Sequence, residues 1–213
     1  DQKIADLLFN RTARLLLLLA VPVTYGIFYL APLIIKIIYG ADFLPSILAL
    51  RVIILIVPLL FLDSLFRYVV YTINKEWHYL WILLALALFN VITNFIFIPK
   101  YGFVAAAWTT LASEAIGFAL LSHMILRGGF SLKLKKTIFS ILRALLGSII
   151  VYWVASALWP YYIATVLSLI AYAIVMLLIE FEEEDKQLLN EAASGIGKYA
   201  VHLYNLARSF VGI

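Results

Sequence analysis

The chain has 213 residues, of which 65% are hydrophobic and only 13% are charged, and its formal net charge is +4. Soluble domains are closer to half apolar and a quarter charged, so the composition excludes an ordinary soluble domain and predicts an integral membrane protein. The chain contains no cysteine, which excludes disulfides, thiolate metal ligands and a cysteine nucleophile. The apolar runs are continuous rather than alternating, which favours membrane helices over strands.

The first part of the chain predicts two environments. Residues 1–14 combine apolar positions at helical spacing with acidic and basic side chains, which is typical of an amphipathic helix at the membrane interface. The first membrane span is predicted at 15–38, because a helix needs about 20 apolar residues to cross about 30 Å of hydrocarbon. Pro22 and Pro32 lie inside this span and predict kinks, which membrane helices tolerate when neighbours bond the freed carbonyls.

The second predicted span, 47–73, carries more charge than the others: Arg51, Asp63 and Arg67. Asp63 and Arg67 are four residues apart, so they share a helix face and can pair. Asp63 is therefore a candidate for this ion pair or for binding a coupling ion. Arg67 has either a structural or snorkelling role near the headgroups, or it binds substrate phosphates, because arginine is a planar bidentate donor to phosphate oxygens.

Polar residues also occur in the third and fourth spans. In the third span, 77–98, Asn90 and Asn94 share a helix face and either hydrogen-bond a neighbouring helix or line a polar cavity. In the fourth span, 103–126, Glu114 lies near the centre, where a carboxylate is costly unless it faces protein or water. Glu114 is therefore either paired within the bundle or a ligand of a coupling ion.

Two further spans are predicted at 138–158 and 163–179, with Arg143 in the first turns of the former. The sequence then becomes acidic, and apolar positions at helical spacing in 181–213 predict a cytoplasmic amphipathic tail. The predicted fold is an all-α integral membrane bundle of about six helices over 15–180, with amphipathic segments at both ends.

Two motifs resemble a known family. Residues 90–114 read NVITNFIFIPKYGFVAAAWTTLASE and are similar to the third-to-fourth helix hairpin in the C-terminal half of polysaccharide (lipid-linked oligosaccharide) flippases. These belong to the multidrug/oligosaccharidyl-lipid/polysaccharide exporter superfamily. Residues 39–46, YGADFLPS, resemble the turn that the same family has between the first two helices of this half. The resemblance covers roughly residues 1–180 and implies one six-helix lobe of a two-lobe exporter, so we expect the chain to be a fragment or a half-length protein.

The distribution of basic residues predicts the orientation. Six crossings put both ends on one side, together with most of the lysines and arginines of the short loops, including those at 127–136. Such loops favour the cytoplasm, so both termini are predicted to be cytoplasmic in a multi-pass protein of the cell membrane.

The sequence carries no Walker glycine loop, no HExxH and no GxSxG. We therefore expect no enzyme activity, catalytic residue, cofactor, metal site or nucleic-acid partner. The resemblance implies that the protein flips a lipid-linked oligosaccharide, on a carrier of the polyprenyl pyrophosphate type, to the outer leaflet by alternating access. The candidate substrate-binding residues are Arg67, Arg51, Arg143, Asn90 and Asn94.

Other functions stay open. A cation-coupled multidrug exporter of the same superfamily would favour acidic and aromatic residues in its cavity. A membrane scaffold subunit would not transport at all, and an integral membrane glycosyltransferase would need an acidic metal-binding motif in a loop, which the sequence lacks. The expected partners are the lipid-linked oligosaccharide, membrane lipids, an N-terminal lobe or a second copy, and the glycosyltransferases or polymerase of polysaccharide biosynthesis.

Overall fold

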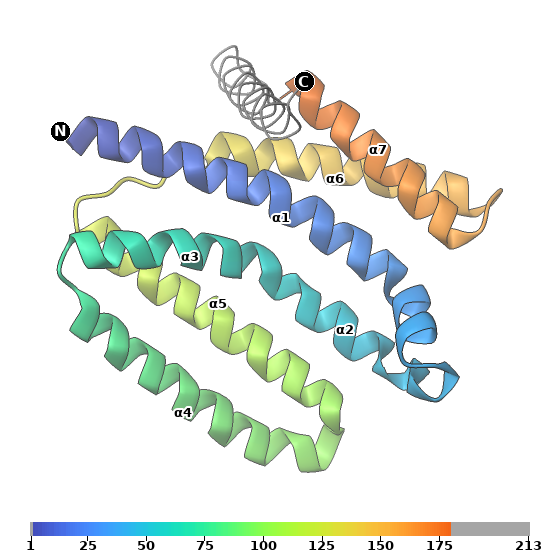
Figure 1. Cartoon of the computed structure of the whole chain (residues 1–213), viewed down its shortest axis with the longest axis horizontal. Helices are drawn as coiled ribbons and strands as arrows, with labels where there is room; N and C mark the ends of the chain where they lie inside the picture. The colour runs from blue at the N-terminus through green and yellow to red at the C-terminus, as the bar shows by residue number, and fades with distance from the viewer. Residues whose placement is uncertain (1, 180–213) are drawn as a thin grey trace, which may run out of the picture.

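The computed structural model describes residues 2–179, and the tail predicted at 181–213 lies outside the described residues. The described part consists of helices and short connections (Figure 1). The elements in order are α1 (Gln2–Ile38), η1 (Ala41–Ser46), α2 (Ile47–Ile53), η2 (Ile54–Ile56), α3 (Val57–Thr72), α4 (Glu76–Tyr101), α5 (Phe103–Arg127), α6 (Lys135–Ser156) and α7 (Tyr161–Ile179).

Within residues 2–179, five helical segments are long and apolar enough to cross a membrane. The helix α7 is also apolar, but its apolar stretch Tyr161–Met176 is shorter than these five. The five are Ile4–Ile38, Ala41–Thr72, Glu76–Tyr101, Phe103–Arg127 and Lys135–Ser156. The structure is thus compatible with a multi-pass helical membrane bundle.

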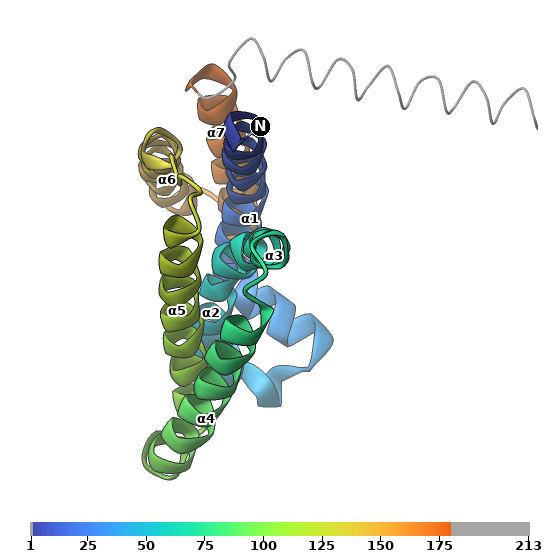
Figure 2. The ribbon, with the colours of Figure 1, turned by 90° about the vertical axis from the view of Figure 1, so that its left-hand side faces the viewer.

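The helix α1 lies between two groups of helices (Figures 1 and 2). On one side, α6 and α7 pack against each other as an antiparallel hairpin. On the other side, α4 packs against α5, and α5 in turn packs against α2 and α3. Because α1 contacts α3 and α2 as well as α7 and α6, it joins the two groups.

The core is built around a stack of aromatic rings. Phe66 of α3 is fully buried and stacks on Phe118 of α5, with ring centroids 5.4 Å apart. Phe9 of α1 lies 5.6 Å from Phe66 on the other side, and Phe130 of the α5–α6 loop meets the edge of Phe9. Four parts of the chain that are distant in sequence therefore meet at one point.

The sequence predicts a separate interfacial helix at 1–14, and the structure differs. The described part of this segment is the first portion of α1. This segment contains neither glycine nor proline, so nothing interrupts the helix before it enters the span. Phe9 and Ala13 are buried in the core. The 37 residues of α1 make a helix about 55 Å long, so one end extends beyond a hydrocarbon layer of about 30 Å.

The N-terminal part of α1 is tied to the loop between α5 and α6. The Nδ2 of Asn10 donates a hydrogen bond of 2.6 Å to the carbonyl of Ser131, and the hydroxyl of Ser131 donates one of 3.0 Å to Asp6 Oδ2. The backbone N–H of Lys133 donates to Asn10 Oδ1. We call these four residues the clasp, because they fix residues 128–134 against α1.

Proline accounts for two of the differences between the predicted spans and the structure. The span predicted at 47–73 is interrupted by η2, because Pro58 has no N–H to give to the carbonyl of Ile54, which instead accepts the N–H of Val57 in a tighter turn. In the other case α4 runs through Pro99 to Tyr101 instead of ending at 98, since a proline in the last turn removes only one bond.

The turn between α4 and α5 is therefore a single residue. Gly102 has a φ of 69°, which lies in the left-handed region that glycine adopts without strain. The spans predicted at 103–126, 138–158 and 163–179 differ from α5, α6 and α7 by at most three residues at either end.

Replacing Phe66 tests this core. We expect Phe66→Ala to lower the free energy of unfolding by about 2 kcal/mol or more, because a cavity replaces a ring that touches two others. Thermal unfolding in mild detergent, followed by circular dichroism, measures the effect. Phe95→Ala is the matched control, since Phe95 is 83% exposed and should change stability by less than about 0.5 kcal/mol. Equal melting temperatures for the two variants would contradict this core.

Candidate functional site

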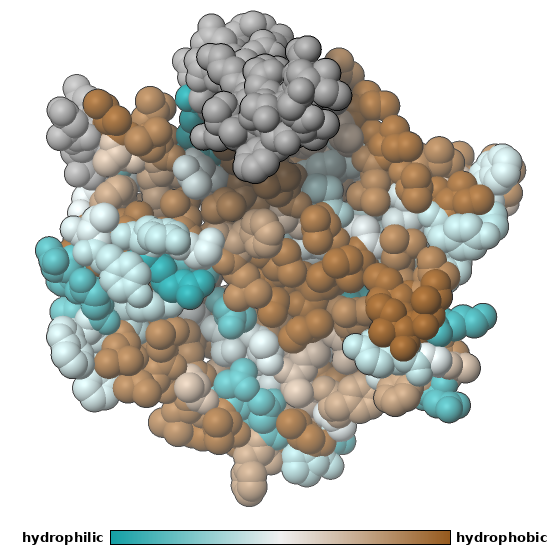
Figure 3. Space-filling model, in the orientation of Figure 1, coloured by the Kyte–Doolittle hydropathy of each residue, from teal (hydrophilic) through white to brown (hydrophobic). Residues whose placement is uncertain are grey.

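A polar cavity lies between α3, α4 and α5. Its volume is 620 Å³. It forms because α4 packs mainly against α5 and only slightly against α3, so α3 and α4 diverge from the turn that joins them, with α5 between them in Figure 1. Several predicted site residues line it together: Asp63 and Arg67 of α3, Asn90 of α4 and Glu114 of α5. In Figure 3, hydrophilic surface gathers over α3 and the region beside α4 within a largely hydrophobic surround.

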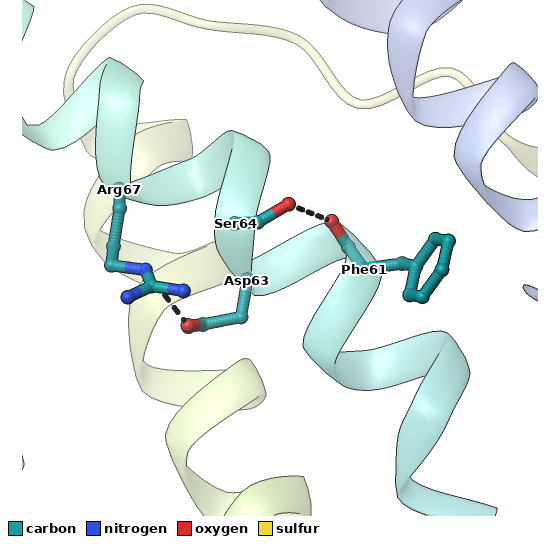
Figure 4. A network of polar contacts seen from close by, with 4 residues as sticks. All are labelled: Phe61, Asp63, Ser64 and Arg67. Carbon is teal, nitrogen blue, oxygen red and sulfur yellow. Dashed lines mark hydrogen bonds and ion pairs between the residues drawn. The ribbon is translucent and has the colours of Figure 1, made fainter.

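Asp63 and Arg67 form the ion pair that their spacing predicts. Arg67 Nε lies 3.3 Å from Asp63 Oδ2, and both side chains leave the same side of α3 (Figure 4). Ser64 points elsewhere and donates a hydrogen bond of 2.6 Å to the carbonyl of Phe61 in its own helix. The side chain of Arg67 is 47% exposed and that of Asp63 is 22% exposed, so Arg67 can leave the pair without unfolding its surroundings.

Glu114 lines the same cavity and is half-buried. In the described part of the chain it forms no hydrogen bond and no ion pair. The lining therefore holds two carboxylates, Asp63 and Glu114, but one guanidinium, Arg67, and no lysine or histidine. With Asp63 already paired, Glu114 is in excess. A carboxylate in such a site is neutralised by a proton or by a cation from outside the lining.

Asn90 and Asn94 hold α4 to α5. The Nδ2 of Asn94 donates to Asn90 Oδ1 at 2.6 Å, and the Nδ2 of Asn90 donates to the hydroxyl of Ser113 at 3.1 Å. The hydroxyl of Thr109 donates to Asn94 Oδ1. The prediction of interhelical hydrogen bonds is thus confirmed for both asparagines. Asn90 also lines the polar cavity, whereas Asn94 does not.

Arg51 lies apart from this cavity and bonds to a carbonyl of α1. Its Nε donates a hydrogen bond of 3.1 Å to the carbonyl of Phe28, and its guanidinium lies 5.3 Å from the centre of the Phe28 ring. Pro32 lies four residues after Phe28 and has no N–H, so the helix itself leaves this carbonyl without its usual partner. Arg51 supplies the missing donor to this carbonyl from α2.

Arg143 also lies apart from the polar cavity, on the exposed side of α6. Its guanidinium lies 4.7 Å from the centre of the Phe139 ring, and one terminal nitrogen lies 3.4 Å from the hydroxyl of Ser140. The structure therefore brings together Asp63, Arg67, Asn90 and Glu114, and it places Asn94, Arg51 and Arg143 elsewhere.

Tyr79 lines the cavity and was not among the residues that the sequence singled out. The sequence does place Tyr79 on the same helix face as Asn90. The residues of that face recur at helical spacing and all line the cavity: Tyr79, Leu83, Leu86 and Asn90. The sequence could not show that this mostly apolar face lines a cavity, since helical spacing indicates which residues share a face but not which neighbour that face contacts.

Comparison with known proteins adds no relative. No protein-family model matches the chain, and no match was found among curated proteins or solved structures. Within residues 2–179, no three histidine or acidic side chains come together in a way that could hold a metal ion.

A double-mutant cycle tests the role of Arg51. We expect Arg51→Met to destabilise the protein by about 1–3 kcal/mol, because it leaves the carbonyl of Phe28 without a donor. Pro32→Ala restores the helix donor to that carbonyl, so Arg51→Met should cost much less in the Pro32→Ala background. Thermal unfolding of the four proteins measures the coupling. An equal cost of Arg51→Met in both backgrounds would refute this role.

Proposed function

We propose that the chain is one lobe of a lipid-linked oligosaccharide flippase. In this proposal it lies in the cell membrane with both termini in the cytoplasm. Together with an N-terminal lobe or a second copy, it moves its cargo to the outer leaflet by alternating access. The observation that carries the proposal is the half-exposed Arg67 in a polar cavity between three apolar spans. The motifs at 39–46 and 90–114 resemble those of the flippase family and support the assignment of this cavity to such a protein.

Arg67 has the free donors that phosphate binding needs. Its contact with Asp63 uses Nε, and its two terminal nitrogens make no hydrogen bond within residues 2–179. A guanidinium presented in this way can bind two phosphate oxygens at once. Asp63 would hold the guanidinium in place while the cavity is empty.

The excess carboxylate supports a second candidate function. A cavity with Asp63, Glu114 and Tyr79 around a single arginine attracts cations once Glu114 is ionised. A cation-coupled exporter of organic cations would use such a lining. For the flippase, the same lining implies that Glu114 is protonated when phosphate binds, or that the second lobe contributes further cationic side chains.

Removing Arg67 tests the flippase. The native protein, isolated from its membrane and reconstituted in vesicles, is assayed for translocation of a fluorescent lipid-linked oligosaccharide. We expect Arg67→Ala to slow translocation about tenfold or more, because charge-assisted hydrogen bonds contribute about 1.5–3 kcal/mol each. Lys100→Ala removes the same charge at the exposed end of α4 and should leave the rate unchanged. A wild-type rate for Arg67→Ala, at equal protein level, would end the proposal for this residue.

Neutralising Glu114 separates the two candidate functions. In cells that express the protein, Glu114→Gln should abolish resistance to cationic drugs if the cavity binds organic cations, because the excess negative charge is lost. If the cavity binds phosphate, the same variant should keep lipid translocation and make it less dependent on pH. Absence of drug resistance in cells that express the wild-type protein would exclude the cation exporter, and resistance that persists in Glu114→Gln would exclude cation binding by Glu114.

A further inference from the structure

A second cavity, of 630 Å³, lies between α6 and the group formed by α3 and α5. Its size is within the range of roughly 300–1,000 Å³ that is usual for ligand pockets. It is distinct from the polar cavity, although Leu59 and Phe118 line both. All its lining residues except one are apolar: Leu17, Pro58, Leu59, Leu62, Phe118, Leu132, Leu134, Lys135, Ile138, Phe139 and Leu142.

This cavity exists because α6 packs against α7 and α1 rather than against α3 or α5. The clasp holds the α5–α6 loop against α1, so the chain reaches α1 just before α6 begins at Lys135. Water gains no hydrogen bonds in a space with this lining, and an empty space forfeits dispersion contacts. Because the cavity opens beside membrane-spanning helices, a hydrocarbon chain of a lipid is the occupant that fills it best.

The charge around the cavity is basic. Lys135, Phe139 and Arg143 are four residues apart in turn, so they form one stripe along α6. Lys135 and Phe139 line the cavity, and Arg143 lies over the Phe139 ring. No acidic residue lines it, and the ammonium of Lys135 makes no ion pair or hydrogen bond among the described residues.

Arg143 itself is placed to attract an anion. It is exposed on a candidate membrane span, and its neighbours Leu142 and Leu146 are 51% and 62% exposed. An arginine on such a surface is costly in hydrocarbon unless it reaches a headgroup or a counter-ion. Its bond to Ser140 directs the guanidinium toward the start of α6, where Lys135 lies. The two residues are about 12 Å apart along the helix axis, a gap that two long side chains can close over Phe139.

We propose that this cavity is a binding site for an anionic phospholipid. One acyl chain lies in the apolar cavity, and the phosphate lies over Phe139 between Lys135 and Arg143. The site does not depend on the transport function proposed above, because Arg67 and Glu114 take no part in it.

Lipid binding to the purified full chain tests the site. The protein in mild detergent is titrated with phosphatidylglycerol and with phosphatidylcholine of the same acyl chains, and bound lipid is counted by native mass spectrometry. We expect phosphatidylglycerol to bind more tightly. Lys135→Gln and Arg143→Gln should each weaken it about fivefold, the usual contribution of one basic residue near a membrane surface, and should weaken phosphatidylcholine binding less, because the choline ammonium offsets the charge of its phosphate.

Lys133→Gln is the matched control, because it removes the same charge from an exposed residue close to the start of α6 but outside the cavity lining. Equal binding of the two lipids by the wild-type protein would overturn the headgroup site. An effect of Lys133→Gln as large as that of Lys135→Gln would also overturn it, since it would indicate a diffuse basic surface.

A cavity-filling variant tests the acyl-chain position. Ile138→Trp should release both lipids, because the indole occupies the space of the chain, while thermal unfolding verifies that the protein is folded. If Ile138→Trp does not fold, Leu142→Phe makes the same test with a smaller increase in volume. Unchanged binding of both lipids by a folded variant would place the chain outside this cavity.

Discussion

In the hydrocarbon of a membrane, a backbone carbonyl that loses its helix donor cannot turn to water. This constraint shapes the structure at Pro32 and Pro58. At Pro32 the side chain of Arg51, from the next helix, supplies the donor. At Pro58 the chain tightens into η2, so the carbonyl of Ile54 is bonded one residue earlier. The junction of α1 with α2, and the change of direction between α2 and α3, both follow from these repairs.

The free-energy cost of an unpaired polar group in hydrocarbon also explains how the polar side chains of the bundle are paired. Asn90 and Asn94 form hydrogen bonds with one another and with hydroxyls of α5, so their main role is to hold α4 against α5. Asp63 and Arg67 satisfy each other within one helix. A charged side chain that lacks such a partner is informative, because it needs a proton, an ion or a ligand to neutralise it. Within residues 2–179, Glu114 in the polar cavity has no such partner, and this is the reason that cation recognition competes with phosphate recognition as an account of the site.

Much of the helical framework could be predicted from the apolar runs, because an uninterrupted run long enough to span has few alternatives. Shared faces could also be predicted, as for Asp63 with Arg67 and Asn90 with Asn94, since they depend only on helical spacing. The neighbour of each face could not. Arg51 and Arg67 are both candidate substrate-binding residues in the sequence. In the structure, Arg51 bonds to a carbonyl of α1 and Arg67 lines the polar cavity, because helix packing, which local sequence does not encode, decides what each side chain contacts.

The clasp has a consequence for the order in which the protein is assembled. Asp6 and Ser131 are separated by 125 residues, so the first turns of α1 have no partner there until the chain has been synthesised as far as the loop after α5. Loop closure over such a distance comes late in folding, after local hairpins such as α4–α5 have formed. The hydrogen bonds of Asp6 and Asn10 to residues 131 and 133 can therefore form only after α3, α4 and α5 have been synthesised.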